Sequence, residues 1–82
     1  MNTNPLTMTL TDFAVEMLNE MGMTATPDSV VRDGRRYTCS EASMSLLGSL
    51  AKYRLFAPCA LTDNEVEVAV GRWFDLHTTE AT

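Results

Sequence analysis

The stretch VVRDGRRY (residues 30–37) decides the fold that this sequence predicts. Its centre, Asp33-Gly34, lies between β-forming residues. Asp-Gly in this setting is the strongest short-range hairpin signal, because both central positions of a type I′ turn need positive φ. We therefore expect strands at about 29–32 and 35–38. A hairpin alone is only marginally stable in water, so we expect it to pack on helices.

The segment before the hairpin has the pattern of an amphipathic helix. Thr9 is a suitable N-cap and Gly22 supplies the stop. Between them, apolar residues recur with the spacing of one buried helical stripe. These residues are Leu10, Phe13, Ala14, Met17, Leu18 and Met21. Residues 24–28, which contain a proline and small polar residues, are expected to form a loop, with a brief helical turn from Pro27 as the alternative.

A second helix is expected after the hairpin, with Ser40 as its N-cap and Pro58 ending it near Phe56. Gly48 weakens this helix by roughly 1 kcal/mol relative to alanine, so we expect a neighbouring element to approach closely there. Met44 and Leu55 are expected to flank its buried face. That face is predicted to contain Ala42, Leu46, Leu47, Leu50, Ala51 and Tyr53.

The third helix has the clearest local signature in the chain. Thr62 and Glu65 form the S/T-x-x-E capping box, and Leu61 and Val66 form the accompanying hydrophobic staple. A helical stripe of mostly aliphatic and aromatic residues, spaced three and one apart, follows. Its members are Val66, Ala69, Val70, Trp73, Phe74 and His77. Residues 78–82 are expected to be a polar tail.

The predicted fold is therefore α+β and mostly helical, with three amphipathic helices and a short β-hairpin between the first and the second. Eighty-two residues form a single domain, residues 1–82, in which residues 1–8 and 78–82 are expected to fray. A chain of this size buries only about 60% of its unfolded surface. Its apolar runs are too short to cross a membrane, and the N-terminus lacks a signal peptide, so we expect a cytoplasmic protein.

No residue constellation of a known enzyme is present. His77 is the single histidine, and Cys39 and Cys59 are not arranged as C-x-x-C. The helix start beside Cys39 can lower a thiol pKa, but no second histidine and no local catalytic signature accompany it, so we expect both cysteines to be buried structural thiols. We expect two free thiols, with a bridge between them left open. The sequence predicts no catalytic residue, metal site or cofactor.

An unpaired line of carboxylates lies on the first helix. Asp12, Glu16 and Glu20 are spaced i, i+4, i+8, and this helix contains no lysine or arginine. Like charges at this spacing cost a few tenths of a kcal/mol each. Carboxylates about 6 Å apart roughly match alternate phosphates of a DNA strand, which rise about 3.4 Å each. The line predicts either a DNA-mimicking surface or a plainly solvated helix face.

Two further charged groups are candidate binding residues. Asp63 and Glu67 open the third helix, and capping accounts for Asp63 but not for Glu67. The three arginines that flank the hairpin turn are suited to gripping an acidic partner or a phosphate backbone, or to keeping an edge hairpin soluble. These arginines are Arg32, Arg35 and Arg36.

The net charge of −5 argues against direct binding of nucleic acid through a broad basic surface. The first function that we expect is binding of the acidic residues to a basic protein surface, such as that of a nucleic-acid-binding complex. In size, acidity and absence of enzymatic motifs, the chain resembles small phage and mobile-element inhibitors of bacterial defence, including anti-CRISPR proteins. That resemblance implies inhibition by protein binding. The alternatives are a small DNA-associated or transcriptional accessory factor that uses the basic hairpin, and a structural subunit that works as a homo-oligomer.

Overall fold

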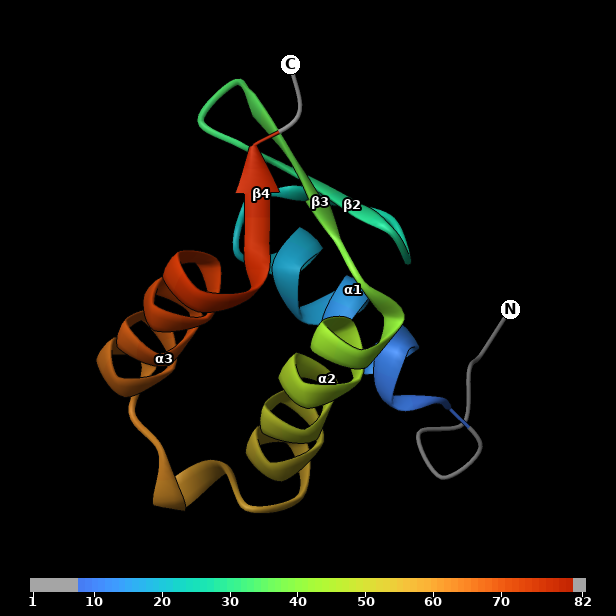
Figure 1. Ribbon diagram of the computed structural model, residues 1–82. Coiled ribbons are helices and arrows are strands. Elements are labelled where there is room, and N and C mark those ends of the chain that lie inside the picture. The colour runs from blue at the N-terminus through green and yellow to red at the C-terminus, as the bar shows by residue number, and fades with distance from the viewer. Residues whose placement is uncertain (1–7, 81–82) are drawn as a thin grey trace.

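A computed structural model describes residues 8–80 and shows the expected α+β, mostly helical architecture (Figure 1). Three helices are packed with a four-stranded antiparallel sheet of order β1-β2-β3-β4. None of the described helices has both the length and the apolar character needed to cross a bilayer. In chain order the elements are α1 (Leu10–Glu20), β1 (Thr24–Ala25), β2 (Ser29–Arg32), β3 (Arg35–Cys39), α2 (Glu41–Phe56), a 3-10 turn (Pro58–Ala60), α3 (Asp63–His77) and β4 (Thr78–Glu80).

Helix α1 begins and ends where the sequence predicts. The Thr9 side chain accepts a hydrogen bond from the backbone N–H of Asp12 at 3.1 Å. At the other end, the N–H of Met23 donates to the Leu18 carbonyl at 3.1 Å and closes the cap around Gly22. The buried residues of α1 belong to the predicted stripe. They are Phe13, Ala14, Met17 and Leu18.

The hairpin of β2 and β3 is confirmed, including its turn type. Asp33 has φ 53° and Gly34 has φ 77°, so both central residues adopt the left-handed conformation of a type I′ turn. The register pairs Val30 with Tyr37 and Arg32 with Arg35. Val30 is fully buried, so the face of the hairpin that carries this pair is turned toward the helices.

The loop expected at residues 24–28 and the tail expected at residues 78–82 are wrong in part, because each contributes an edge strand. β1 pairs with β2, and β4 pairs with β3. Both segments are too short to carry a periodic signal. They become strands because the hairpin leaves a row of unpaired backbone N–H and C=O groups along each edge. Met8, expected to fray, packs against the core, and the fraying expected at 1–7 and 81–82 lies outside the described residues.

Helix α2 has the predicted limits but a different buried face. Ser40 caps it, accepting from the N–H of Ser43 at 3.1 Å, and it ends at Phe56. Of the predicted face, Leu47 and Ala51 are buried, whereas Leu46 and Tyr53 are more than half exposed and Ala42 is exposed too. Apolar residues occur on both sides of α2, so periodicity does not select one. The observed buried set is Ser43, Met44, Leu47, Gly48 and Ala51.

Helix α3 joins α2 to the sheet through aromatic side chains. Its capping box is present as predicted, with Thr62 and Glu65 bonded reciprocally. The indole N–H of Trp73 donates to the buried Ser43 carbonyl at 2.9 Å. Phe74 meets Trp73 edge-on at 4.9 Å and Tyr37 of β3 at 5.4 Å between ring centroids. His77, expected on the buried stripe, is exposed at the last turn of α3.

Gly48 marks the closest approach between two helices. A methyl group built on its Cα would overlap the backbone carbonyl of Leu10 at the start of α1. The element that the sequence predicts to approach Gly48 closely is therefore α1. Glycine here permits helix α1 to lie directly on α2, and the buried faces of both helices meet in the core.

Replacing Gly48 with alanine is expected to lower the free energy of unfolding by about 3 kcal/mol, because the added methyl group forces the two backbones apart. Urea unfolding followed by fluorescence of Trp73, the single tryptophan, measures this loss. Gly71 is a matched control, since a methyl group there meets nothing within 4 Å. Gly71→Ala should raise the stability by up to about 1 kcal/mol, and equal effects of the two substitutions would contradict the close approach.

Candidate functional site

The three carboxylates predicted to line α1 lie along its solvent-facing side. Asp12, Glu16 and Glu20 are all exposed, on the side away from the buried Phe13 and Met17. Among the described residues, none of these three acids is held in an ion pair. No described basic side chain neutralises them, so the line is a negative surface of the described part of the chain.

One end of this line enters a pocket of about 390 Å³ between the three helices. Glu20 and Met21 line it from the end of α1, and Arg54 lines it from the last turns of α2. The first turns of α3 supply the rest of the lining. These residues are Asp63, Val66 and Glu67. The fold therefore brings Glu20, Asp63 and Glu67 together from two helices that are far apart in the sequence.

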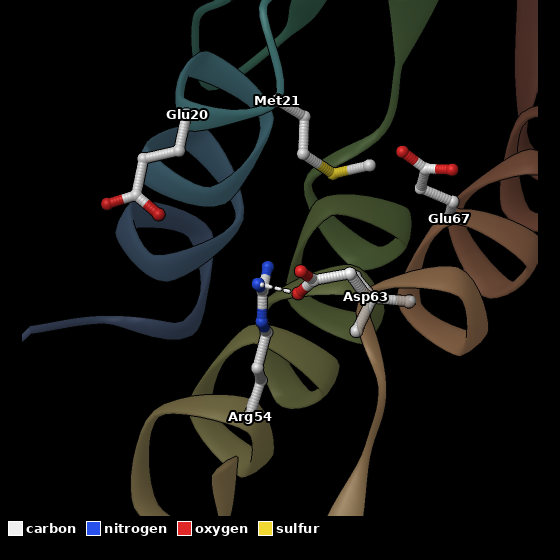
Figure 2. Close-up of a pocket in the computed structure, with 6 residues that line it drawn as sticks. Glu20, Met21, Arg54, Asp63 and Glu67 are labelled. Carbon is white, nitrogen blue, oxygen red and sulfur yellow. Dashed lines mark hydrogen bonds and ion pairs between the residues drawn. The ribbon is translucent and has the colours of Figure 1, made fainter.

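Arg54 is the basic residue of this pocket, and it is paired with Asp63. Their side chains meet at 2.6 Å, with Asp63 88% exposed to solvent. Figure 2 shows the guanidinium of Arg54 beside Asp63, with Glu20 and Glu67 on opposite sides of this pair and the Glu20 carboxylate turned outward. An exposed ion pair of this kind contributes about 0–1 kcal/mol, so its effect on stability is small. The pocket lining contains three carboxylates and one guanidinium, so its net charge is negative.

The structure divides the three hairpin arginines between two faces of the sheet. Arg32 lies on the face toward the helices, and its guanidinium covers the Phe74 ring at 4.8 Å from the centroid. Its register partner Arg35 is on the same face, whereas Arg36, opposite Val31, is on the other. The three hairpin arginines therefore do not form one continuous basic surface, and the Arg32 guanidinium already contacts the Phe74 ring.

The histidine and one of the cysteines are placed on neighbouring strands and helix ends. His77 is exposed at the end of α3, directly before Thr78, which is the register partner of Cys39. Cys39 and Cys59 are both free thiols. Within residues 8–80, no three His, Cys, Asp or Glu side chains come close enough together to hold a metal ion. The arrangement that the described residues do offer is electrostatic: an exposed acidic line leading to an acidic pocket.

The burial expected of both cysteines holds in part for Cys39, which is half-buried, and is wrong for Cys59, which is exposed. Burial raises the pKa of the Cys39 thiol, because the thiolate loses its hydration, and the nearby Asp28 carboxylate raises it further by repulsion. Cys39 is the last residue of β3 and is half-buried against the core. At this position, burial raises the pKa of the Cys39 thiol by more than the dipole of α2 lowers it.

Sequence reasoning found the acids of this site but missed Arg54. The signal that could have found it is the break at Pro58, which turns the chain back so that the end of α2 lies beside the start of α3. Arg54 and Asp63 are nine positions apart in the sequence, and this separation fits a short connection between antiparallel helices.

Comparison with known proteins finds no match: no protein-family model, no curated protein and no solved structure is significantly similar to the chain.

At neutral pH, iodoacetamide should alkylate Cys59 well before Cys39, because Cys59 is exposed and the Cys39 thiolate is disfavoured by burial. Mass spectrometry of the single variants Cys39→Ser and Cys59→Ser separates the two rates. Adding Asp28→Asn to the Cys59→Ser variant should lower the pKa of Cys39 and speed its alkylation. Faster reaction at Cys39 than at Cys59 in the folded protein would show that the assignment is wrong.

Proposed function

We propose that this chain is a non-enzymatic acidic binding module, which engages a basic surface on another protein through α1 and the pocket at its end. The observation that carries the proposal is the exposed line of Asp12, Glu16 and Glu20, none of them in an ion pair with a described residue. Glu20 belongs both to this line and to the pocket. The negative surface therefore continues from α1 to Glu67 on α3.

The geometry of the line suits a target that normally holds nucleic acid. Four residues of helix rise about 6 Å, so the carboxylates follow one another at roughly the spacing of alternate phosphates. A lysine- and arginine-lined channel would meet a similar series of negative charges on this helix. Complementary charge of this kind speeds association and rejects partners of the wrong sign.

The pocket adds a place where a basic side chain of the partner fits. Glu20 and Glu67 flank it without ion-pair partners among the described residues, while Arg54 is held by Asp63. A lysine or arginine of the partner would meet Glu20 at one side of the pocket and Glu67 at the other.

The narrower form of the proposal is a phage-encoded inhibitor of the anti-CRISPR type that acts in the cytoplasm. It would occupy the nucleic-acid channel of a bacterial defence complex and so prevent the complex from holding its DNA or RNA. Support for this form comes from the small size, the net charge of −5 and the acidic line. Two free thiols agree with a reducing compartment.

The alternative of a DNA-associated factor receives less support from the described residues. The hairpin arginines face two sides of the sheet, and Arg32 covers Phe74. The acidic side of α1 would repel a phosphate backbone, as would the first turns of α3. A duplex mobility shift lost in Arg35→Ala plus Arg36→Ala would favour that alternative.

Neutralising the line with Glu16→Gln plus Glu20→Gln should abolish capture of the partner while leaving the fold intact. The measurement is affinity capture from a bacterial lysate by the immobilised wild type and the variant, with the captured proteins identified by mass spectrometry. We expect a basic, nucleic-acid-binding protein that only the wild type retains. Its retention should fall as salt rises, and duplex DNA should compete with it.

Glu41→Gln plus Asp75→Asn is the matched control, because it removes the same charge from exposed positions outside the line and the pocket. This control should capture the partner as the wild type does. If both double variants lose the partner equally, net charge alone explains binding and the proposed site is wrong. If neither loses it, the acidic line plays no part.

A further inference from the structure

The side of α2 that faces away from the core carries an exposed row of apolar and small residues. Leu46, Tyr53 and Phe56 are 54%, 52% and 53% exposed. Ala42 and Ser49 are exposed as well. These five residues follow one another at spacings of four, three, four and three, which is the a/d spacing of a coiled-coil seam. We call them the α2 seam.

Within residues 8–80, the seam residues stay exposed, so no described element covers them. α1 packs on α2 at Gly48 and contacts Ser45 through Thr11, and α3 bonds to the buried side of α2 through Trp73 and Ser43. Figure 1 shows α3 to one side of α2 and α1 behind it. Large apolar side chains are usually placed where they lose contact with water, so a row of three on one exposed helix face indicates a contact surface.

The seam is uncharged although the protein carries a net charge of −5. The acidic line and the acids of the pocket belong to α1 and α3, while Glu41 and Lys52 border the seam on α2 itself. Two copies can therefore bring their seams together without opposing carboxylates. A highly charged partner, by contrast, would lose hydration there and gain no ion pair.

The sizes of the seam residues are self-complementary in an antiparallel pair. With the two-fold axis close to Ser49, Ala42 faces Phe56 of the second copy, and Leu46 faces its Tyr53. The smallest apolar side chain thus meets the large Phe56 at both ends, and the two Ser49 side chains meet at the centre. A parallel pair would place Phe56 against Phe56 and Ala42 against Ala42, which crowds one end and leaves the other empty.

We infer that the occupant of this surface is a second copy of the chain, bound through antiparallel pairing of the two α2 helices. Each half-exposed aromatic side chain offers on the order of 100 Å². The whole seam offers roughly 400 Å² per copy, against about 800 Å² in a standard stable interface. The pair is accordingly a weak, reversible homodimer with a dissociation constant in the micromolar range. Its acidic lines remain outside, so each dimer presents two of them.

Sedimentation equilibrium over a range from low micromolar to high hundreds of micromolar tests the pairing. The wild type should change from monomer to dimer across this range. Tyr53→Glu should weaken the dimer at least tenfold, because it places a charge in the middle of the seam opposite Leu46. Val68→Glu is the matched control, since Val68 is 51% exposed on α3, outside the seam. It should dimerise as the wild type does.

Mixing two variants tests the antiparallel orientation. Ala42→Glu and Phe56→Lys should each weaken self-association, and an equimolar mixture should restore dimers, because the new glutamate faces the new lysine. Circular dichroism confirms that each variant is folded. A wild type that stays monomeric at the highest concentration would overturn the inference and leave another protein as the occupant. Dimers that survive Tyr53→Glu, or a mixture that does not restore them, would overturn the proposed pairing.

Discussion

The fold depends on the contact between Gly48 and the carbonyl of Leu10. With no side chain at this point, α1 lies directly on α2, and the buried residues of both helices pack into one core. The same contact determines what faces outward. Once Gly48 is turned toward α1, the side of α1 that carries Asp12, Glu16 and Glu20 points to solvent, and so does the α2 seam.

Two interactions of different strength hold α3 beside α2. At the sheet end, the Trp73 indole bonds to the buried Ser43 carbonyl, and Phe74 packs against Trp73 and Tyr37. This end combines a buried hydrogen bond, worth about 1 kcal/mol net, with burial of large aromatic rings. At the other end, the exposed Arg54–Asp63 pair contributes less. The contacts of Trp73 and Phe74 therefore fix the position of α3, and the pocket opens at the Arg54–Asp63 end.

The folded chain therefore separates surfaces of three kinds. The acidic line and the pocket gather carboxylates from α1 and α3, the hairpin carries three arginines on its two faces, and the α2 seam is uncharged. The acidic line and pocket favour contact with a basic protein. The hairpin arginines favour an acidic or aromatic group, and the α2 seam favours an apolar face. Because they lie on different elements, pairing of two α2 helices is compatible with binding of a basic partner by α1.

The local chemistry of the chain determined the ends of its elements. The Thr9, Ser40 and Thr62 caps, the Asp33-Gly34 turn and the stop at Gly22 each act within a few residues, so they can be read from the sequence. The acids of the site were also visible there, because their spacing is a property of one helix. Tertiary structure decided which side of α2 is buried, because that helix is apolar on both sides and only the position of α1 distinguishes them. It also made strands of Thr24–Ala25 and Thr78–Glu80, raised the Cys39 pKa and brought Arg54 between Glu20 and Glu67. These features arise from contacts between segments distant in the chain, and no local pattern encodes such contacts.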